Sequence, residues 1–168
     1  MLREFEETNR RLRAELNKLH GELNQRKGEI GEFWIKSLLR KYSNAGRYFA
    51  PGELGNNREK LRLPRYRRVE RYAFIAYDRE IQMDVLCEPV QTSELYLAVE
   101  VKNRQARPVS AEEIAEFAEK LQALREHLGQ VELKGLYYSF SGFQAAALDK
   151  LQELEFFWWD FAMLDRLK

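Results

Sequence analysis

The chain has 168 residues, which suits one domain with an appendage, and it is 45% hydrophobic and 33% charged. Its net charge of +1 gives no general affinity for nucleic acid, although a local basic patch can still attract phosphate. The single cysteine, Cys87, has no partner for an intrachain disulfide, and no apolar run is long enough to span a membrane. The charged N-terminus lacks the apolar core of a signal peptide, so we expect a soluble, cytoplasmic protein with no membrane partner.

The first thirty residues carry a seam of side chains at alternating spacings of three and four. Its members are Leu2, Phe5, Asn9, Leu12, Leu16, Leu19, Leu23, Arg26 and Ile30. This heptad pattern is typical of a coiled coil, in which one Asn on the seam fixes the register and favours two strands. We expect residues 1–27 to form a helix that joins two copies into a parallel dimer. The alternative is a single amphipathic helix that lies on the domain.

Residues 27–42 present a helical apolar face, with Gly28 and Gly31 at its start to allow a close approach of another backbone. Glu29 and Glu32 share one side of this helix. We expect Glu29 to be solvated, and we expect Glu32, which directly precedes the apolar part, to reach a functional site.

The one concentrated basic segment spans residues 58–72 and follows a loop, 43–57, that is rich in Gly, Asn and Pro. Its cations are Arg58, Lys60, Arg62, Arg65, Arg67, Arg68 and Arg71. Arginine forks suit phosphate oxygens, so this segment predicts contact with a nucleic-acid backbone. The residues that we expect to make this contact are Arg62, Arg65, Arg67, Arg68 and Arg104. The alternative is a solvated loop of alternating charges.

The remaining elements alternate between strands and helices. Residues 71–77, 80–90 and 95–103 read as an antiparallel three-strand meander. A helix over 110–128 follows, with Ser110 and Glu113 spaced as a capping box. A strand (133–141), a helix (143–154), a short strand (155–160) and a terminal helix complete the chain. Strands separated by helices imply crossovers and some parallel pairing, hence an α/β fold.

Two of these apolar strands carry charges where a buried strand normally has none. Asp84 lies in REIQMDVLCEP, and Glu100 and Lys102 lie in LYLAVEVKNR. Alternate strand residues share a face, so Glu100 and Lys102 point the same way. Carboxylates beside an ammonium suit a divalent cation and phosphodiester hydrolysis, whereas the structural alternative is a cross-strand ion pair.

The order of helix, three-strand meander, helix, strand, with Asp84 and Glu100-Val101-Lys102 on neighbouring strands, resembles the PD-(D/E)XK nuclease superfamily. Within it the chain is most similar to the Mrr-type restriction endonuclease catalytic domain, over roughly residues 28–168. The likeness includes the Gly-Glu pair of the first helix and the tail GLYYSFSGFQAAALDKLQELEFFWWDFAMLDRL. The chain departs from the family's pattern at Met83, where the family has Pro.

This resemblance implies a restriction-endonuclease-like core that follows the N-terminal coiled-coil helix and acts as a Mg²⁺- or Mn²⁺-dependent DNA endonuclease. Asp84, Glu100 and the backbone carbonyl of Val101 supply oxygen ligands for the metal. Lys102 either helps to deprotonate the attacking water or stabilises charge on the phosphorus, and the sequence leaves both open. Glu32 is expected to orient Lys102 or to bind a second metal.

Gln82, two residues before Asp84, is expected to share its face and to hydrogen-bond the phosphate or the water. His20 and His127, the only histidines, lack the spacing of zinc ligands or of a catalytic triad. The alternative function is a non-catalytic nuclease-fold module for DNA binding or assembly, dimerised by the same helix. A partner protein that supplies specificity is also compatible with the sequence.

Overall fold

The computed structural model describes residues 2–56 and 59–166, without the side chains of residues 2–6, 8, 9, 24 and 165. The side chains of the seam residues Leu2, Phe5 and Asn9, and all of Arg58, therefore lie outside the described part. The elements are α1 (Leu2–Asn44), β1 (Tyr48–Phe49), β2 (Leu61–Arg62), β3 (Tyr66–Ala76), β4 (Arg79–Pro89), β5 (Tyr96–Lys102), α2 (Ala111–Leu128), β6 (Leu133–Ser139), α3 (Ala145–Glu153), β7 (Phe157–Asp160) and α4 (Phe161–Asp165).

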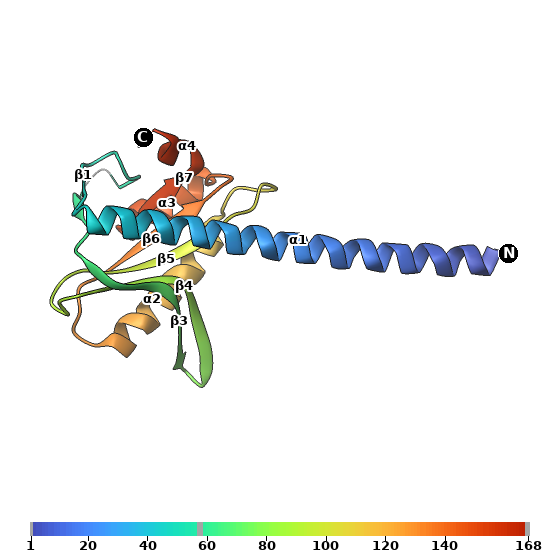
Figure 1. Ribbon diagram of the computed structural model, residues 1–168, viewed down its shortest axis with the longest axis horizontal. Coiled ribbons are helices and arrows are strands. Elements are labelled where there is room, and N and C mark those ends of the chain that lie inside the picture. Colours follow the sequence, from blue (N-terminus) through green and yellow to red (C-terminus); the bar gives the residue numbers. More distant parts are fainter. Residues whose placement is uncertain (1, 57–58, 167–168) are drawn as a thin grey trace.

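Helix α1 is continuous and projects far beyond the rest of the molecule (Figure 1). It passes through Gly21 and Gly28 without a break, so nothing in its backbone separates the heptad segment from the helix that follows. Its C-terminal part packs on the sheet through Ile35 and Leu39, which are fully buried. Its N-terminal part stands free, which excludes the alternative of a helix lying on the domain.

A five-stranded mixed sheet, in the order β3-β4-β5-β6-β7, forms the centre of the molecule. The β3, β4 and β5 strands are antiparallel neighbours, as the meander predicts. The β5, β6 and β7 strands are parallel, because α2 and α3 carry the chain back between them. The mixed α/β class expected from the sequence is confirmed, and a separate small sheet of β1 and β2 is added to it.

The sheet lies between two helical layers, each with its own apolar core. Helix α1 covers one face, where Ile35 and Leu39 meet apolar side chains of β4, β5 and β7. Helices α2 and α3 cover the other face, where Phe117 and Leu151 meet Tyr137 of β6. Helix α2 begins with the expected capping box, in which both hydrogen bonds between Ser110 and Glu113 are present.

The sequence-based boundaries differ most in the basic segment. Strand β3 begins at Tyr66 rather than at Arg71, so Arg67 and Arg68 belong to a strand rather than to a solvated loop. Val69 and Phe74 are buried on β3 and belong to the cores on opposite faces of the sheet, while the arginines of this strand are exposed. Strand β3 lies at the edge of the sheet, where a run of cations can remain solvated.

Candidate active site

The candidate site lies where β4 and β5 diverge. Their antiparallel pairing includes Val85 and Val99 but goes no further along β5. The next amide of β5 on that side belongs to Val101, and it donates a 2.8 Å hydrogen bond to Oδ2 of Asp84. The carboxylate of Asp84 thus takes the place that a backbone carbonyl would hold in a continued ladder.

A slip in the β3–β4 register directs Asp84 into this gap. Arg71 of β3 faces both Asp84 and Val85, because the pairing shifts by one residue there. Met83 packs in the α2 layer and Val85 in the α1 layer, although strict alternation would put both on one face. Bulges of this kind redirect side chains, often beside functional sites.

Strict alternation was also the basis for expecting Gln82 on the same face as Asp84. The slip interrupts that alternation, and Gln82 is exposed and donates a 2.6 Å hydrogen bond to Glu80 instead. No hydrogen bond or ion pair among the described residues joins Gln82 to the candidate site. The structure therefore gives no geometric support for its expected role.

Glu100 is the most buried charged group of the chain's described part, with only 4% of its surface exposed. Oε1 of Glu100 accepts a 2.8 Å hydrogen bond from Nζ of Lys102, its neighbour on the same strand face. Oε2 accepts a 3.1 Å hydrogen bond from Nζ of Lys120, which reaches in from α2. Two ammonium groups therefore neutralise one buried carboxylate, as burial of a charge requires.

Glu32 approaches from α1. Its two carboxylate oxygens both accept hydrogen bonds from one guanidinium nitrogen, Nη2 of Arg71, at 2.8 Å each. The expected contact with Lys102 is not formed, and Glu32 influences Asp84 only through space. Near this point α1 is fixed to the loop after β5, because the side-chain amide of Asn103 donates a 2.5 Å hydrogen bond to the backbone carbonyl of Lys27.

The electrostatics join these groups into one cluster. Burial, and after it the carboxylates of Glu100 and Glu32, raise the pKa of Asp84 to about 6 against the opposing effects of the Val101 amide and Lys102. Burial disfavours the charged form of Lys102, but the Glu100 carboxylate outweighs that cost and raises the lysine's pKa. Lys102 is therefore an ammonium at neutral pH in this arrangement.

The donor set fits a hard divalent cation. Lys102 accepts through its carbonyl from Phe140 on the β6 side, so the alternate residue Val101 turns its N–H and C=O toward β4. The Val101 carbonyl therefore faces the same gap as Asp84, whose pKa is raised chiefly by burial and next by the Glu100 carboxylate. In the described part of the chain, no three His, Cys, Asp or Glu side chains form a metal-binding group by themselves. Two carboxylates and a carbonyl leave positions for water, which Mg²⁺ usually retains.

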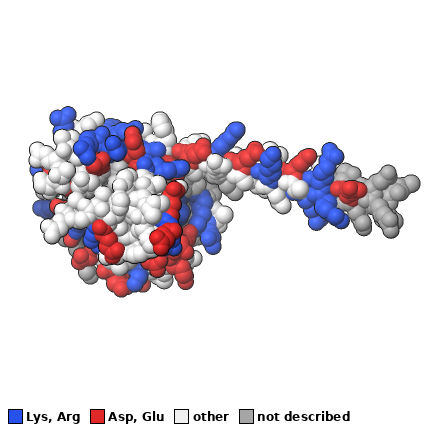
Figure 2. Space-filling model, turned by 90° about the horizontal axis from the view of Figure 1, so that it is seen from below, with Lys and Arg blue, Asp and Glu red and all other residues white. Residues whose placement is uncertain are grey.

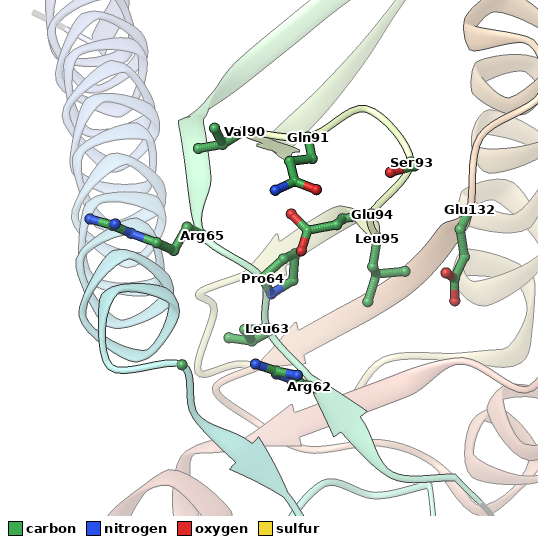
Figure 3. A pocket seen from close by; sticks show the side chains of 11 residues that line it. Arg62, Leu63, Pro64, Arg65, Val90, Gln91, Ser93, Glu94, Leu95 and Glu132 are labelled. Atoms are coloured by element: carbon green, nitrogen blue, oxygen red, sulfur yellow. The ribbon is translucent and has the colours of Figure 1, made fainter.

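The arginines expected to bind nucleic acid are dispersed. Arg62 and Arg65 line an open pocket of about 630 Å³ at the other end of β5, where Glu94 and Glu132 also lie (Figure 3). Leu95, at the same pocket, is seven residues from Lys102, or roughly 23 Å in an extended strand. This mixed-charge pocket is separate from the candidate site.

The other three expected arginines are paired with acids. Arg67 and Arg68 both contact Glu88 of β4. Arg104 donates to Glu113 at 2.6 Å and thereby holds the loop after β5 to the start of α2. The guanidinium of Arg104 lowers the pKa of Glu113 to about 2.

Three residues of the site were not predicted from the sequence to belong to it. Lys120 follows Phe117 by three positions and precedes Leu124 by four, so a cation on the buried face of α2 was visible in the pattern. Tyr137 lies beside Glu100 in the β5–β6 register, and its buried hydroxyl has no hydrogen-bond partner in the structure. No local sequence pattern indicates that Arg71 pairs with Glu32, because only the tertiary structure brings these two residues together.

Comparisons of the chain with protein-family models, with curated proteins and with solved structures found no match. Of the helices in the described part of the chain, none is both long and apolar enough to cross a lipid bilayer.

Proposed function

We propose that the chain is a divalent-metal-dependent endonuclease that hydrolyses DNA phosphodiester bonds with a restriction-endonuclease-like core. One observation carries the proposal: Asp84 fills the β4–β5 gap against the Val101 amide, within the electrostatic influence of Glu100 and Lys102. A structural ion pair needs one cation for each carboxylate. Here both lysines hydrogen-bond Glu100, and the partly buried Asp84 carboxylate has no ion-pair partner among the described residues.

Each residue then has a defined role. Asp84, Glu100 and the Val101 carbonyl would hold Mg²⁺ or Mn²⁺. Such an ion, when bound, would supply an acidified water and positive charge beside the scissile phosphate. Lys102 acts as an ammonium that stabilises the negative charge developing on the phosphate, since its raised pKa favours a cation over a base. Glu32 fixes Arg71 at the edge of the site.

The proposed substrate is double-stranded DNA, and the proposed assembly is a homodimer through the N-terminal helix. Arg62 and Arg65 are exposed cations outside the site, and Arg67 and Arg68 share a single glutamate, so these four are the candidates to contact phosphates distant from the cleaved bond. These arginines support weak, sequence-independent binding, and a partner protein would supply the sequence specificity. The buried, reduced thiol of Cys87 suits a cytoplasmic protein.

The test is plasmid cleavage with Mg²⁺ or Mn²⁺, with and without chelator, by wild type, Asp84→Ala and Lys102→Ala. The matched control is Lys134→Ala, because Lys134 is also a partly buried lysine paired to a carboxylate, that of Glu59, but lies outside the cluster. We expect nicking that requires metal and survives only in wild type and in the control. Equal nicking by Lys102→Ala would reject the role of Lys102, and intact plasmid under all metals would reject the nuclease.

The second candidate is a nuclease-fold module for DNA binding or assembly that has no turnover. The specific observation in its favour is that both oxygens of Glu100 are already held by Lys102 and Lys120. Metal-independent DNA retention in a gel-shift assay, combined with no cleavage, would favour this module over the enzyme.

A further inference from the structure

The free part of α1 carries an unpartnered apolar stripe. The exposed fractions are 57% for Leu12, 53% for Leu16, 61% for Leu19 and 51% for Leu23. The stripe is interrupted by the polar seam residue Arg26 and resumes beyond the segment assigned to the coiled coil, where Ile30 is 66% and Phe33 is 68% exposed. All six occupy the a and d positions of one uninterrupted heptad frame.

The stripe faces away from the chain's own domain. Gly31, Ile35 and Leu39 are the buried residues of this part of α1, and they lie on the opposite side of the helix from Ile30 and Phe33. A partner helix can therefore continue along the seam as far as Phe33 without meeting the sheet of the chain to which it docks. The next seam position, Ser37, is polar and ends the stripe.

The charges beside the stripe select both the partner and its direction. The g positions Glu15, Glu22 and Glu29 are acidic, whereas the e positions Arg13 and Lys27 are basic and the e position between them is His20. In a parallel pair each g residue faces the e residue five positions later in the other helix, which brings Glu22 to Lys27 and Glu15 to His20. An antiparallel pair sets g against g and e against e, and so places like charges together. Both signs are visible along the projecting helix in Figure 2.

We propose that a second copy of this chain docks on α1 in parallel and in register, with a seam that runs from the free helix onto the domain as far as Phe33. The inference deepens the dimer proposed above. The parallel dimer also has a consequence for the candidate site, because α1 leaves the domain beside that site. There the side-chain amide of Asn103 donates a hydrogen bond to the carbonyl of Lys27, and Arg71 donates to Glu32. The two sites then lie at the same level, one on each side of the twofold axis.

That arrangement matches duplex DNA. The two strands of a duplex are related by twofold axes perpendicular to its length, and symmetric dimers place their own twofold on such an axis. DNA that crosses the domain end of the coil would therefore meet one site on each strand. This consequence rests on the proposed nuclease activity, whereas the parallel seam itself does not.

The seam is tested with the full chain by sedimentation equilibrium. We expect a dimer whose dissociation constant rises about 100-fold in Leu16→Asp and at least about 10-fold in Phe33→Asp. The control Ala14→Asp adds the same charge at an exposed f position and should leave the dimer unchanged. A monomeric wild type, or a dimer indifferent to Leu16→Asp, would overturn the proposal.

The direction is tested by oxidation of Leu16→Cys, because a seam residue meets its own copy only in a parallel, in-register pair. The native thiol, Cys87, is buried and will not interfere. Cross-linked dimer is expected for Leu16→Cys and not for Ala14→Cys, and a dimer that fails to cross-link would refute the parallel arrangement. If the dimer is parallel yet no plasmid is cut by any variant, the nuclease proposal fails and the dimer stands.

Discussion

Replacement of Asp84 by Asn should stabilise the metal-free protein at neutral pH. The pKa of Asp84 is about 6, against 3.8 for the free side chain, because the carboxylate is buried and lies near Glu100. That difference is worth about 3 kcal/mol. Since the side chain is partly open to solvent, we expect about 1–2 kcal/mol. The Asn carbonyl oxygen can still accept the 2.8 Å hydrogen bond from the Val101 amide, so the backbone contact survives the substitution.

The sign follows from proton binding. The folded protein retains the Asp84 proton up to about pH 6, whereas the unfolded chain loses it near 3.8. The contribution of Asp84 to stability therefore falls as pH rises between these values and is lost as pH rises through about 6. The advantage of Asp84→Asn should be absent below about pH 4 and should reach about 3–6 °C in melting temperature at pH 7.5.

The assay is thermal unfolding in chelator at pH 4, 6 and 7.5, followed by titration with Mg²⁺ or Mn²⁺. Metal should raise the melting temperature of wild type and not of the variant, because ligand binding stabilises only a folded state that binds it. Asp78→Asn, in the exposed turn between β3 and β4, is the control and should show neither effect. Destabilisation by Asp84→Asn at pH 7.5 in chelator would refute the account of an uncompensated carboxylate.

Two further substitutions test the packing around the site. Gly31→Ala should lower the free energy of unfolding by about 1–3 kcal/mol, because its Cβ would lie 2.5 Å from the Asn103 Cβ, whereas Gly28→Ala, with no atom within 4 Å, should raise it by about 0.5–1 kcal/mol. Equal effects in urea denaturation would contradict the close contact. Lys120→Met should cost about 1–3 kcal/mol in metal-free protein, since buried Glu100 loses one of its two ammonium partners. An unchanged melting temperature would show that the other lysine suffices.

The elements built on strong periodicity were predictable. Ser110 and Glu113 mark the start of α2 by a local capping pattern, which needs no tertiary contact to be recognised. The Glu100 and Lys102 pair was also predictable, because two residues two apart on a strand must share a face. The role of Gln82 was inferred by the same rule and lost its support, since a one-residue register slip reverses the rule locally.

The roles of the charged side chains depended on partners from distant segments. Arg104 is expected from the sequence to contact DNA, but in the structure it is paired with Glu113. Glu32 is expected to orient Lys102 or to bind a second metal, and in the structure its carboxylate is paired with Arg71. An exposed arginine and a paired arginine have the same sequence signature. Only the packing of α1 and α2 against the sheet decides which carboxylate lies within reach.

By itself the sequence determined the heptad helix, the mixed α/β order and the charges set in buried strands, because each is a repeat or spacing that acts over a few residues. Tertiary structure alone decided that Asp84 completes the β5 ladder at Val101, that Lys120 reaches Glu100, and that the seam of α1 faces away from its own domain. These features join segments far apart in the chain. Their geometry is set by strand register and helix placement, which local patterns do not encode.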